Sequence, residues 1–309
     1  RHQTIHAQVG LIMHQSPKQL REQLREQLFQ RWSQSRTSLN PAEQAELLAL
    51  GLDIFRPVEP INKQQIQTAI DFSNIETVFS TESTQKNVQA NSTLIAEHQS
   101  AGVGQRGKSW STPLGLSVCL SQRFELNTGL QHMTGYPLTI ALACLQSIKS
   151  LDPHAAVSIK WPNDLYCHGV KFAGILTQVQ PKHEQCTEVT IGIGINWQLG
   201  PQHFAQIDQP VCNIPLNTRD ITRNEFIITL LKQIQHNNQQ FIQHGFASFV
   251  ETWQVNDALK GQELTLTTAS GTHHGDYAGI SDQGEIQLNI NGQLKRFASG
   301  EAQLMKKDV

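Results

Sequence analysis

The sequence predicts an α+β fold that ends in a small all-β module. Short apolar runs between residues 158 and 176 are interrupted by turn residues, which predicts strands. Residues 137–151 repeat apolar side chains at helical spacing. After about residue 258, apolar and polar residues alternate, which is typical of strands with one buried face.

The first 70 residues predict a helical N-terminal extension. This segment is rich in Gln and Arg, and we expect helices from Pro17 to Trp32 and from Pro41 to Leu50. It lacks two helices joined by a short turn with a basic recognition face, so DNA binding is disfavoured.

Residues 71–257 predict the main domain, in which strands alternate with helices. The helix from Pro137 to Leu151 places four apolar residues on one face, namely Leu138, Leu142, Leu145 and Ile148. The run from Thr222 to Glu225 forms a capping box, which predicts the start of a second helix. The apolar faces of both helices are expected to pack in the core.

Residues 258–309 predict the all-β module. Leu264–Leu266 and Ile286–Ile290 alternate apolar and polar positions, and Asn291-Gly292 supplies a hairpin turn before Leu294.

Composition fits a cytoplasmic enzyme without membrane or nucleic-acid affinity. The 309 residues carry a net charge of −2 and an isoelectric point near 6.7, and no segment approaches a membrane span or a secretory signal. Five cysteines without paired spacing argue for reduced thiols and against structural zinc. The thirteen histidines form no H-E-x-x-H pattern, so we assign no protein metal ligands.

Lys171 is the first candidate functional residue. It precedes the apolar segment Phe172–Leu176, and an ammonium group at the mouth of a buried strand needs an anionic partner. That partner is either a protein carboxylate or the phosphate or carboxylate of a ligand.

A glycine-rich segment supplies the second candidate. Gly102, Gly104 and Gly107 match the dinucleotide pattern G-x-G-x-x-G, but Pro113 and Gly115 follow, so we expect a loop and no helix there. Glycines allow successive N–H groups to approach an anion, and Arg106 and Lys108 add positive charge. The loop is therefore suited to a phosphate or an acyl-phosphate.

Together these motifs resemble the biotin protein ligases, enzymes that activate biotin with ATP and attach it to a carrier-protein lysine. The resemblance rests first on Lys160–Asp164 followed by Lys171–Leu176. The glycine loop is similar, although Val103 and Gln105 stand where the family usually has arginines. Further matches are Thr81–Gln85, with Gln85 replacing the usual asparagine of a Ser-Thr-Asn element, and the strand Val189–Asn196, which in the family faces nucleotide.

The resemblance implies a mixed-sheet, class II synthetase-like catalytic domain, as in the biotin and lipoate ligases, and an SH3-like β-barrel at the C-terminal end. Implied catalytic residues are Lys171, Asp164 and Arg106. Implied biotin-binding residues are Ser83, Thr84, Gln85, Gln99, Val103, Gly104, Gln105, Lys171 and Gly174. Implied ATP- or adenylate-binding residues are Gly102, Arg106, Gly107, Lys108, Trp110, Lys160, Asn163 and Asn196.

The resemblance also implies ATP, biotin and Mg²⁺ as cofactors. It implies the biotin carboxyl carrier protein of acetyl-CoA carboxylase as the acceptor, and it is compatible with a homodimer. Two alternatives stay open. A lipoate-protein ligase shares the chemistry and a related fold, and a biotin-responsive transcriptional repressor would use an N-terminal DNA-binding module.

Overall fold

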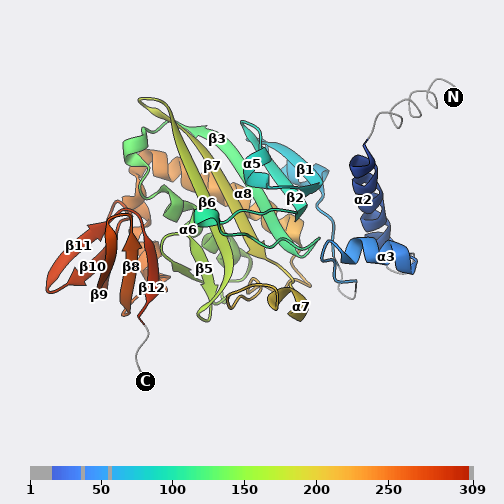
Figure 1. Ribbon diagram of the computed structural model, residues 1–309. Coiled ribbons are helices and arrows are strands. Elements are labelled where there is room, and N and C mark those ends of the chain that lie inside the picture. The colour runs from blue at the N-terminus through green and yellow to red at the C-terminus, as the bar shows by residue number, and fades with distance from the viewer. Residues whose placement is uncertain (1–15, 36–38, 55–57, 306–309) are drawn as a thin grey trace.

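The computed structural model describes residues 16–35, 39–54 and 58–305, and its ribbon is shown in Figure 1. The α-helices of these residues are α2 (Pro17–Ser35), α3 (Pro41–Leu48), α4 (Lys63–Ala69), α5 (Thr84–Asn87), α6 (Tyr136–Leu151), α7 (Pro201–Phe204), α8 (Arg223–His244) and α9 (Val250–Val255). Of these described helices, none is both long enough and apolar enough to cross a membrane.

The central sheet has seven strands in the order β1-β2-β3-β7-β6-β5-β4. β1 and β2 are parallel and the other neighbours are antiparallel, so the sheet is mixed as expected. Its strands are β1 (Asn74–Thr81), β2 (Ser92–Gln99), β3 (Ser117–Leu126), β4 (Ser158–Lys160), β5 (Asp164–Cys167), β6 (Val170–His183) and β7 (Cys186–Asn196).

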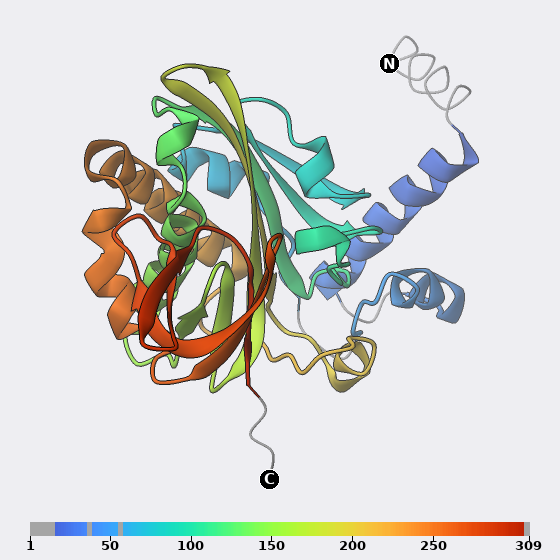
Figure 2. The same cartoon turned by 60° about the vertical axis from the view of Figure 1, so that its left-hand side comes forward.

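The C-terminal sheet has five antiparallel strands in the order β11-β10-β9-β8-β12, and it lies at the end of the molecule opposite to α2 and α3 (Figures 1 and 2). The predicted turn is present. Asn291 and Gly292 lie between the two strands of the hairpin, which end at Ile290 and begin at Gln293, and both have positive φ. The strands are β8 (Glu263–Thr268), β9 (Gly271–Ile280), β10 (Ile286–Ile290), β11 (Gln293–Phe297) and β12 (Glu301–Leu304).

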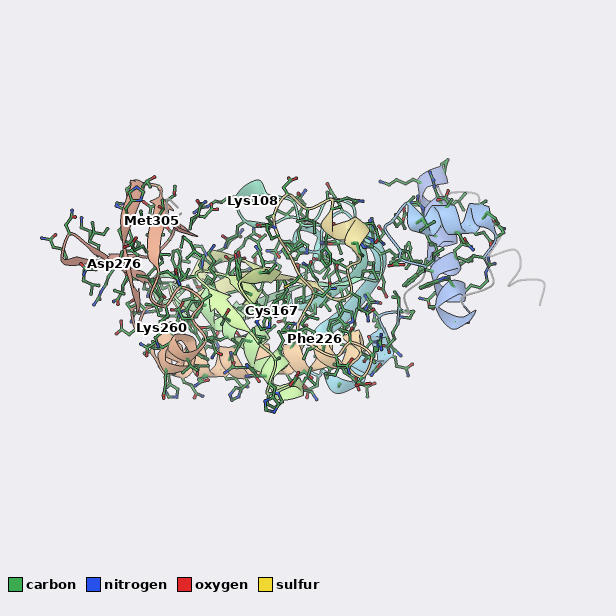
Figure 3. The ribbon with its side chains drawn as sticks, turned by 90° about the horizontal axis from the view of Figure 1, so that it is seen from below. Lys108, Cys167, Phe226, Lys260, Asp276 and Met305 are labelled. Atoms are coloured by element: carbon green, nitrogen blue, oxygen red, sulfur yellow. The ribbon has the colours of Figure 1, made fainter. Side chains whose placement is uncertain are left out.

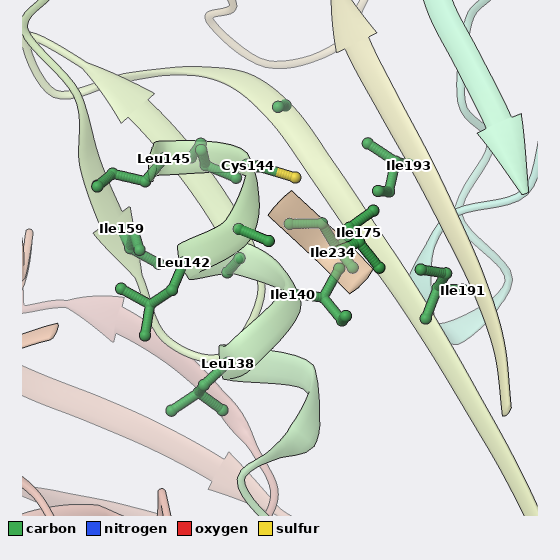
Figure 4. Close-up of a cluster of buried hydrophobic side chains, with 14 of the residues drawn as sticks. Leu138, Ile140, Leu142, Cys144, Leu145, Ile159, Ile175, Ile191, Ile193 and Ile234 are labelled. Carbon is green, nitrogen blue, oxygen red and sulfur yellow. The ribbon is translucent and has the colours of Figure 1, made fainter. Parts of the chain in front are cut away.

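Helices α6 and α8 cover one face of the central sheet. α6 spans nearly the predicted residues, and α8 begins at the predicted capping box, where Thr222 accepts a hydrogen bond from the Glu225 N–H. Figure 4 shows Ile175, Ile191 and Ile193 of the sheet pointing toward α6. Because side chains alternate along a strand, the residues between these isoleucines point to the opposite face.

A buried ion pair ties the segment before α4 to the sheet and to α8. Arg223 Nη2 lies 2.8 Å from Glu97 Oε2, and the two side chains are only 2% and 7% exposed. The Ile61 N–H donates to Glu97 Oε1 at 2.5 Å, and the Asn62 N–H donates to Asn224 Oδ1 at 2.8 Å. The start of α8 therefore holds three separate parts of the chain together.

The N-terminal helices pack on the rest of the chain through a second apolar cluster. Phe29 and Trp32 of α2 and Leu47 of α3 are buried in this cluster with Phe79 and Leu114 of the main domain. The two predicted helices are thus present with slightly different ends. Figure 3 shows them at one end of the molecule, with Phe226 inside the main body.

Candidate active site

A cavity lies on the face of the central sheet that α6 and α8 leave free, and the C-terminal sheet closes one side of it with Gly300, Glu301 and Ala302. Most of the residues predicted from the sequence line this cavity, namely Ser83, Thr84, Gln85, Gln99, Val103, Gly104, Gln105, Arg106, Lys108, Trp110, Lys160, Asn163, Asp164, Lys171 and Gly174. Motifs that are far apart in sequence, from Ser83 to Gly194, therefore converge on one site.

Lys171 has a protein carboxylate as its partner. Its Nζ lies 2.7 Å from Asp164 Oδ1, with the side chains 16% and 23% exposed. Lys171 Nζ also lies 5.7 Å from the centroid of the Trp110 ring, within the range of a cation–π contact. The antiparallel pairing of β5 with β6 brings the lysine and the aspartate together.

Lys160 is a second cation in the same cavity. Burial lowers the pKa of Lys160, and nearby Lys171 lowers it further, while Asp164 opposes this shift. Its Nζ lies 5.5 Å from the Tyr166 ring centroid, and burial raises the pKa of Tyr166 to about 12. Tyr166 lies between the two motifs Lys160–Asp164 and Lys171–Leu176, so the sequence patterns did not identify it as a functional residue.

Glycines on β6 and β7 make room for an indole ring on the floor of the cavity. A Cβ on Gly194 would collide with the Trp110 ring, and one on Gly174 would lie 3.1 Å from Trp110 Cζ3. The Trp110 Nε1–H is buried and has no hydrogen-bond partner among the described residues. The glycines therefore serve close packing and cavity shape at once.

Hydroxyl and amide groups line the inner wall. Gln99 Oε1 accepts from the Thr84 N–H at 2.7 Å, and Gln99 Nε2 donates to Thr112 Oγ1 at 3.0 Å. Ser121 Oγ lies 2.9 Å from Thr84 Oγ1. In contrast, the Ser83 hydroxyl is buried with no hydrogen-bond partner in the described structure. An unpaired hydroxyl at a cavity wall is available to a polar ligand atom.

The glycine segment is a loop, as expected. Gly104 N–H donates to Lys108 O at 2.6 Å and Trp110 N–H donates to Gly102 O at 2.8 Å, which closes the loop on itself. Only a three-residue 3₁₀ turn forms, and Arg106 within it has a left-handed backbone with φ of +56°.

Both basic side chains of this loop contact Glu301 of β12. Arg106 Nη1 lies 2.5 Å from Glu301 Oε2, and Lys108 Nζ lies 3.1 Å from Oε1. The hydrogen bond from Lys108 is the main reason that the pKa of Glu301 is lowered. Lys108 lies at the periphery of the molecule in Figure 3. Glu301 is not among the functional residues predicted from the sequence.

Three predicted residues do not line the cavity. A Cβ on Gly102 would collide with Trp110 O, so this glycine allows close packing within the loop. A Cβ on Gly107 would meet no other atom nearby. Asn196 is buried, and its side chain donates to Cys212 O at 3.0 Å. Asn163 does line the cavity, but its amide is used in a hydrogen bond to Ile175 O that fixes the turn between β4 and β5.

Comparison with known proteins agrees with this geometry. Residues 70–196 match the model of the family described as "Biotin/lipoate A/B protein ligase family". The "Bifunctional ligase/repressor BirA" of Escherichia coli is 27% identical over 296 residues, which cover 90% of this chain and 92% of that protein. The "Biotin--[acetyl-CoA-carboxylase] ligase" of Paracoccus denitrificans is 28% identical and covers 63% of this chain and 82% of that protein.

A similar solved structure is the biotin protein ligase from Aquifex aeolicus in complex with biotin and ATP. It has a TM-score of 0.63 and 24% identity, and the match covers 76% of this chain and all of that one, which supports the fold. The sequence matches and the motifs gathered around the cavity make the chain similar to the biotin protein ligases, and its residues 70–196 match the biotin/lipoate A/B protein ligase family.

Proposed function

We propose that this chain is an ATP-dependent biotin ligase, which forms biotinyl-5′-AMP and transfers biotin to a lysine of the biotin carboxyl carrier protein of acetyl-CoA carboxylase. The observation that carries the proposal is the single cavity that combines cations from β4, β6 and the glycine loop with a glycine floor beneath Trp110. The printed names of similar proteins support this choice of substrate and acceptor.

In the first step, a carboxylate oxygen of biotin attacks the α-phosphorus of ATP, and the bond to the β-phosphate breaks to release pyrophosphate. Negative charge grows on the α-phosphate in the transition state. Lys171, Lys160 and Arg106 line the cavity at positions suited to stabilise this charge. The unpaired Ser83 hydroxyl, with Thr84 and Gln99 beside it, is available to the ureido group of biotin.

In the second step, the carrier lysine attacks the acyl carbon of the mixed anhydride, and AMP leaves. At pH 7.4 only about one lysine in a thousand is neutral, which costs roughly 4 kcal/mol. Asp164 is our candidate to orient the amine and accept its proton, because it is the carboxylate beside Lys171 in the cavity. Transfer of Lys171 from Asp164 to the phosphate during the first step would free this carboxylate for the second.

Magnesium is proposed to arrive with the phosphates of ATP. The described residues contain no group of three His, Cys, Asp or Glu side chains that could hold a metal ion. We also propose that the enzyme works in the cytoplasm, where ATP and the carrier are present.

The test combines the protein with ATP, magnesium and radiolabelled biotin, with and without a biotin carboxyl carrier domain. We expect label on the intact carrier and no label on a carrier whose acceptor lysine is changed to arginine. If lipoate, in place of biotin, drives pyrophosphate release and carrier labelling, the chain is a lipoate ligase.

A second candidate role is transcriptional repression. It is favoured by the matches to bifunctional ligase/repressors, which extend over 90% of this chain. Within the described part of the N-terminal segment, however, α2 and α3 are joined by ion pairs from Arg21 and Arg25 to Glu46, which neutralise the basic residues. We therefore rank this role below ligation.

A further inference from the structure

The cavity is built on successive rows of residues that cross three neighbouring strands. On the face opposite α6, a first row lies beneath Trp110 and consists of Cys119, Gly194 and Gly174. The next row consists of Ser121, Gly192 and Leu176. A third row, Arg123, Thr190 and Gln178, lies outside the cavity. Because equivalent positions repeat every two residues, neighbouring rows are about 7 Å apart.

Gln85 lies across the second row and ends the cavity there. Its side chain packs directly on the backbone of Gly192, because a Cβ on that residue would collide with Gln85 Oε1. Gln85 Nε2 donates to Gln178 Oε1 at 3.0 Å and to Thr190 O at 3.3 Å. Ser121 Oγ lies 3.1 Å from Gln85 Oε1. Gln178 and Thr190 therefore support Gln85 from the side that faces away from the cavity.

Both N–H groups of the Gln85 amide are thus engaged by the protein, while its oxygen has only the Ser121 hydroxyl beside it, whose single proton is shared with Thr84 Oγ1. This distinguishes it from the buried Ser83 hydroxyl, which has no partner among the described residues. Because both N–H groups are used, the amide cannot donate to a ligand without breaking an existing hydrogen bond, whereas Oε1 keeps a lone pair; the side chain limits space through its fixed position.

The opposite end of the cavity holds the cation. Lys171 lies beside the first row, where a Cβ on Gly174 would be 3.5 Å from its Nζ. If the carboxylate of the substrate lies at Lys171, as the proposed function requires, its ring system extends toward Gln85.

We propose that Gln85, supported by Gln178, is the end wall of the acid-binding cavity and determines how large a ring system the enzyme accepts. This inference rests on the proposed function and adds to it a limit on the substrate class, namely compact bicyclic ureido acids without substituents at the ring end. An asparagine at this position, one methylene shorter, would move the wall outward.

The experiment measures kcat/KM for pyrophosphate release with three acids: biotin, biotin benzylated on a ureido nitrogen, and homobiotin, which is longer by one methylene in its side chain. For Gln85→Ala, we expect the ratio of N-benzylbiotin to biotin to rise at least about tenfold over the parent, because the removed wall relieves a steric exclusion. The ratio of homobiotin to biotin should also rise, because its carboxylate is held at Lys171 and the extra methylene pushes the ring toward Gln85.

Gln178→Ala provides a second variant that leaves the wall residue in place but removes its support, and a smaller rise is expected. Gln180→Ala is the matched control, because Gln180 lies on the same face of β6, one row further from the cavity, and is exposed. Thermal melting checks that each variant is folded.

Unchanged N-benzylbiotin ratios in both Gln85→Ala and Gln178→Ala, with biotin still adenylated, would overturn the wall while leaving the ligase function standing. A rise of either ratio in Gln180→Ala as large as that in Gln85→Ala would mean that the cavity has loosened generally, which also contradicts an end wall. If the parent releases no pyrophosphate with biotin, the proposed function fails, and the inference fails with it.

Discussion

Lys171 illustrates how one side chain depends on its surroundings for its chemistry. Its ammonium sits between the Asp164 carboxylate and the face of Trp110, in a site that is mostly shielded from water. Positive charge acts more strongly on a developing phosphate charge there than it would in bulk solvent. The residue therefore gives a sharp test of the proposed first step.

Lys171→Ala is expected to reduce biotinyl-adenylate formation at least about a hundredfold, because it removes stabilisation of transition-state charge. Rapid-quench measurement of the adenylate, at saturating biotin and ATP, gives the rate. Lys182→Ala, at the exposed far end of β6, is the control and should leave the rate within twofold of the parent. Near-normal adenylation by folded Lys171→Ala would remove this lysine from the mechanism.

The lowered pKa of Lys160 predicts a pH effect on the rate of adenylation. Because its pKa is lowered, the side chain loses its charge at a lower pH than an ordinary lysine, and any contribution of that charge to adenylation is lost as pH rises through the lowered pKa. Lys160→Arg keeps its charge throughout the alkaline range, so the falling limb of the pH–rate profile should move to higher pH. Superimposable alkaline limbs for parent and variant would show that Lys160 does not set this limb.

At the scale of elements, the sequence predicted those helices and turns that short local residue patterns encode. The apolar face of α6, the capping box of α8 and the hairpin turn at Asn291 are encoded within a few neighbouring residues, and the structure confirms them. The strands predicted between residues 158 and 176 are present as β4, β5 and β6, but β6 runs on to His183, beyond the predicted apolar runs.

Contacts across long separations were not predictable in the same way. Glu301 reaches Arg106 over 195 residues of sequence, and no local pattern marks that pairing. The partner of Lys171 was left open between protein and ligand, because the pairing of β5 with β6 decides it. Gln85 was recognised only through its resemblance to a family motif, and its support by Gln178 depends on the fold.

The glycine loop predicts weak retention of the intermediate. Val103 and Gln105 line the cavity where the family usually has arginines, and neither carries charge. Restoring charge with Gln105→Arg should slow the escape of biotinyl-adenylate, since a charged hydrogen bond contributes about 1.5 to 3 kcal/mol. A filter assay that traps released adenylate would measure this, with Gln105→Met as an uncharged control of similar length. Equal escape rates for all three proteins would show that other contacts retain the intermediate.

The link between β2 and α8 predicts a large effect on stability. Glu97→Gln keeps the shape of the side chain but leaves Arg223 buried without its counter-charge, so we expect a loss of about 3 kcal/mol in the free energy of unfolding. Denaturant titration measures it. Glu76→Gln, on β1, should change the free energy by less than about 0.5 kcal/mol. A similarly small change for Glu97→Gln would mean that water or other groups compensate for the lost carboxylate.

At the scale of the whole molecule, the core is continuous from the central sheet into the C-terminal module. Leu264, Leu266 and Tyr277 of that module belong to the same buried cluster as α6 and the sheet. The Trp161 Nε1–H also donates to Gly284 O at 3.1 Å, so the Lys-Trp-Pro motif is anchored on the module. The domain boundary near residue 258 stays a prediction, since the packing continues across it.

The N-terminal segment predicts different results for two truncations. Removing residues 1–57 deletes α2 and α3 but keeps Ile61 and its hydrogen bond to Glu97, so pyrophosphate release should survive in part. Removing residues 1–65 also breaks that link and should lower the melting temperature further. In a gel-shift assay with the promoter of the biotin operon, the intact protein should form no specific complex. A salt-sensitive, biotin-dependent complex that disappears on truncation would instead establish a repressor.

The two ion pairs made by Glu301 have a kinetic consequence for the encounter with nucleotide. With its carboxylate in place, the two cations of the glycine loop present a local charge of one unit instead of two. Long-range attraction speeds the diffusion of an anion toward a cationic site, and dissolved ions screen that attraction. The association rate of ATP should therefore fall only gently with ionic strength in this protein, and more steeply once Glu301 is replaced by glutamine.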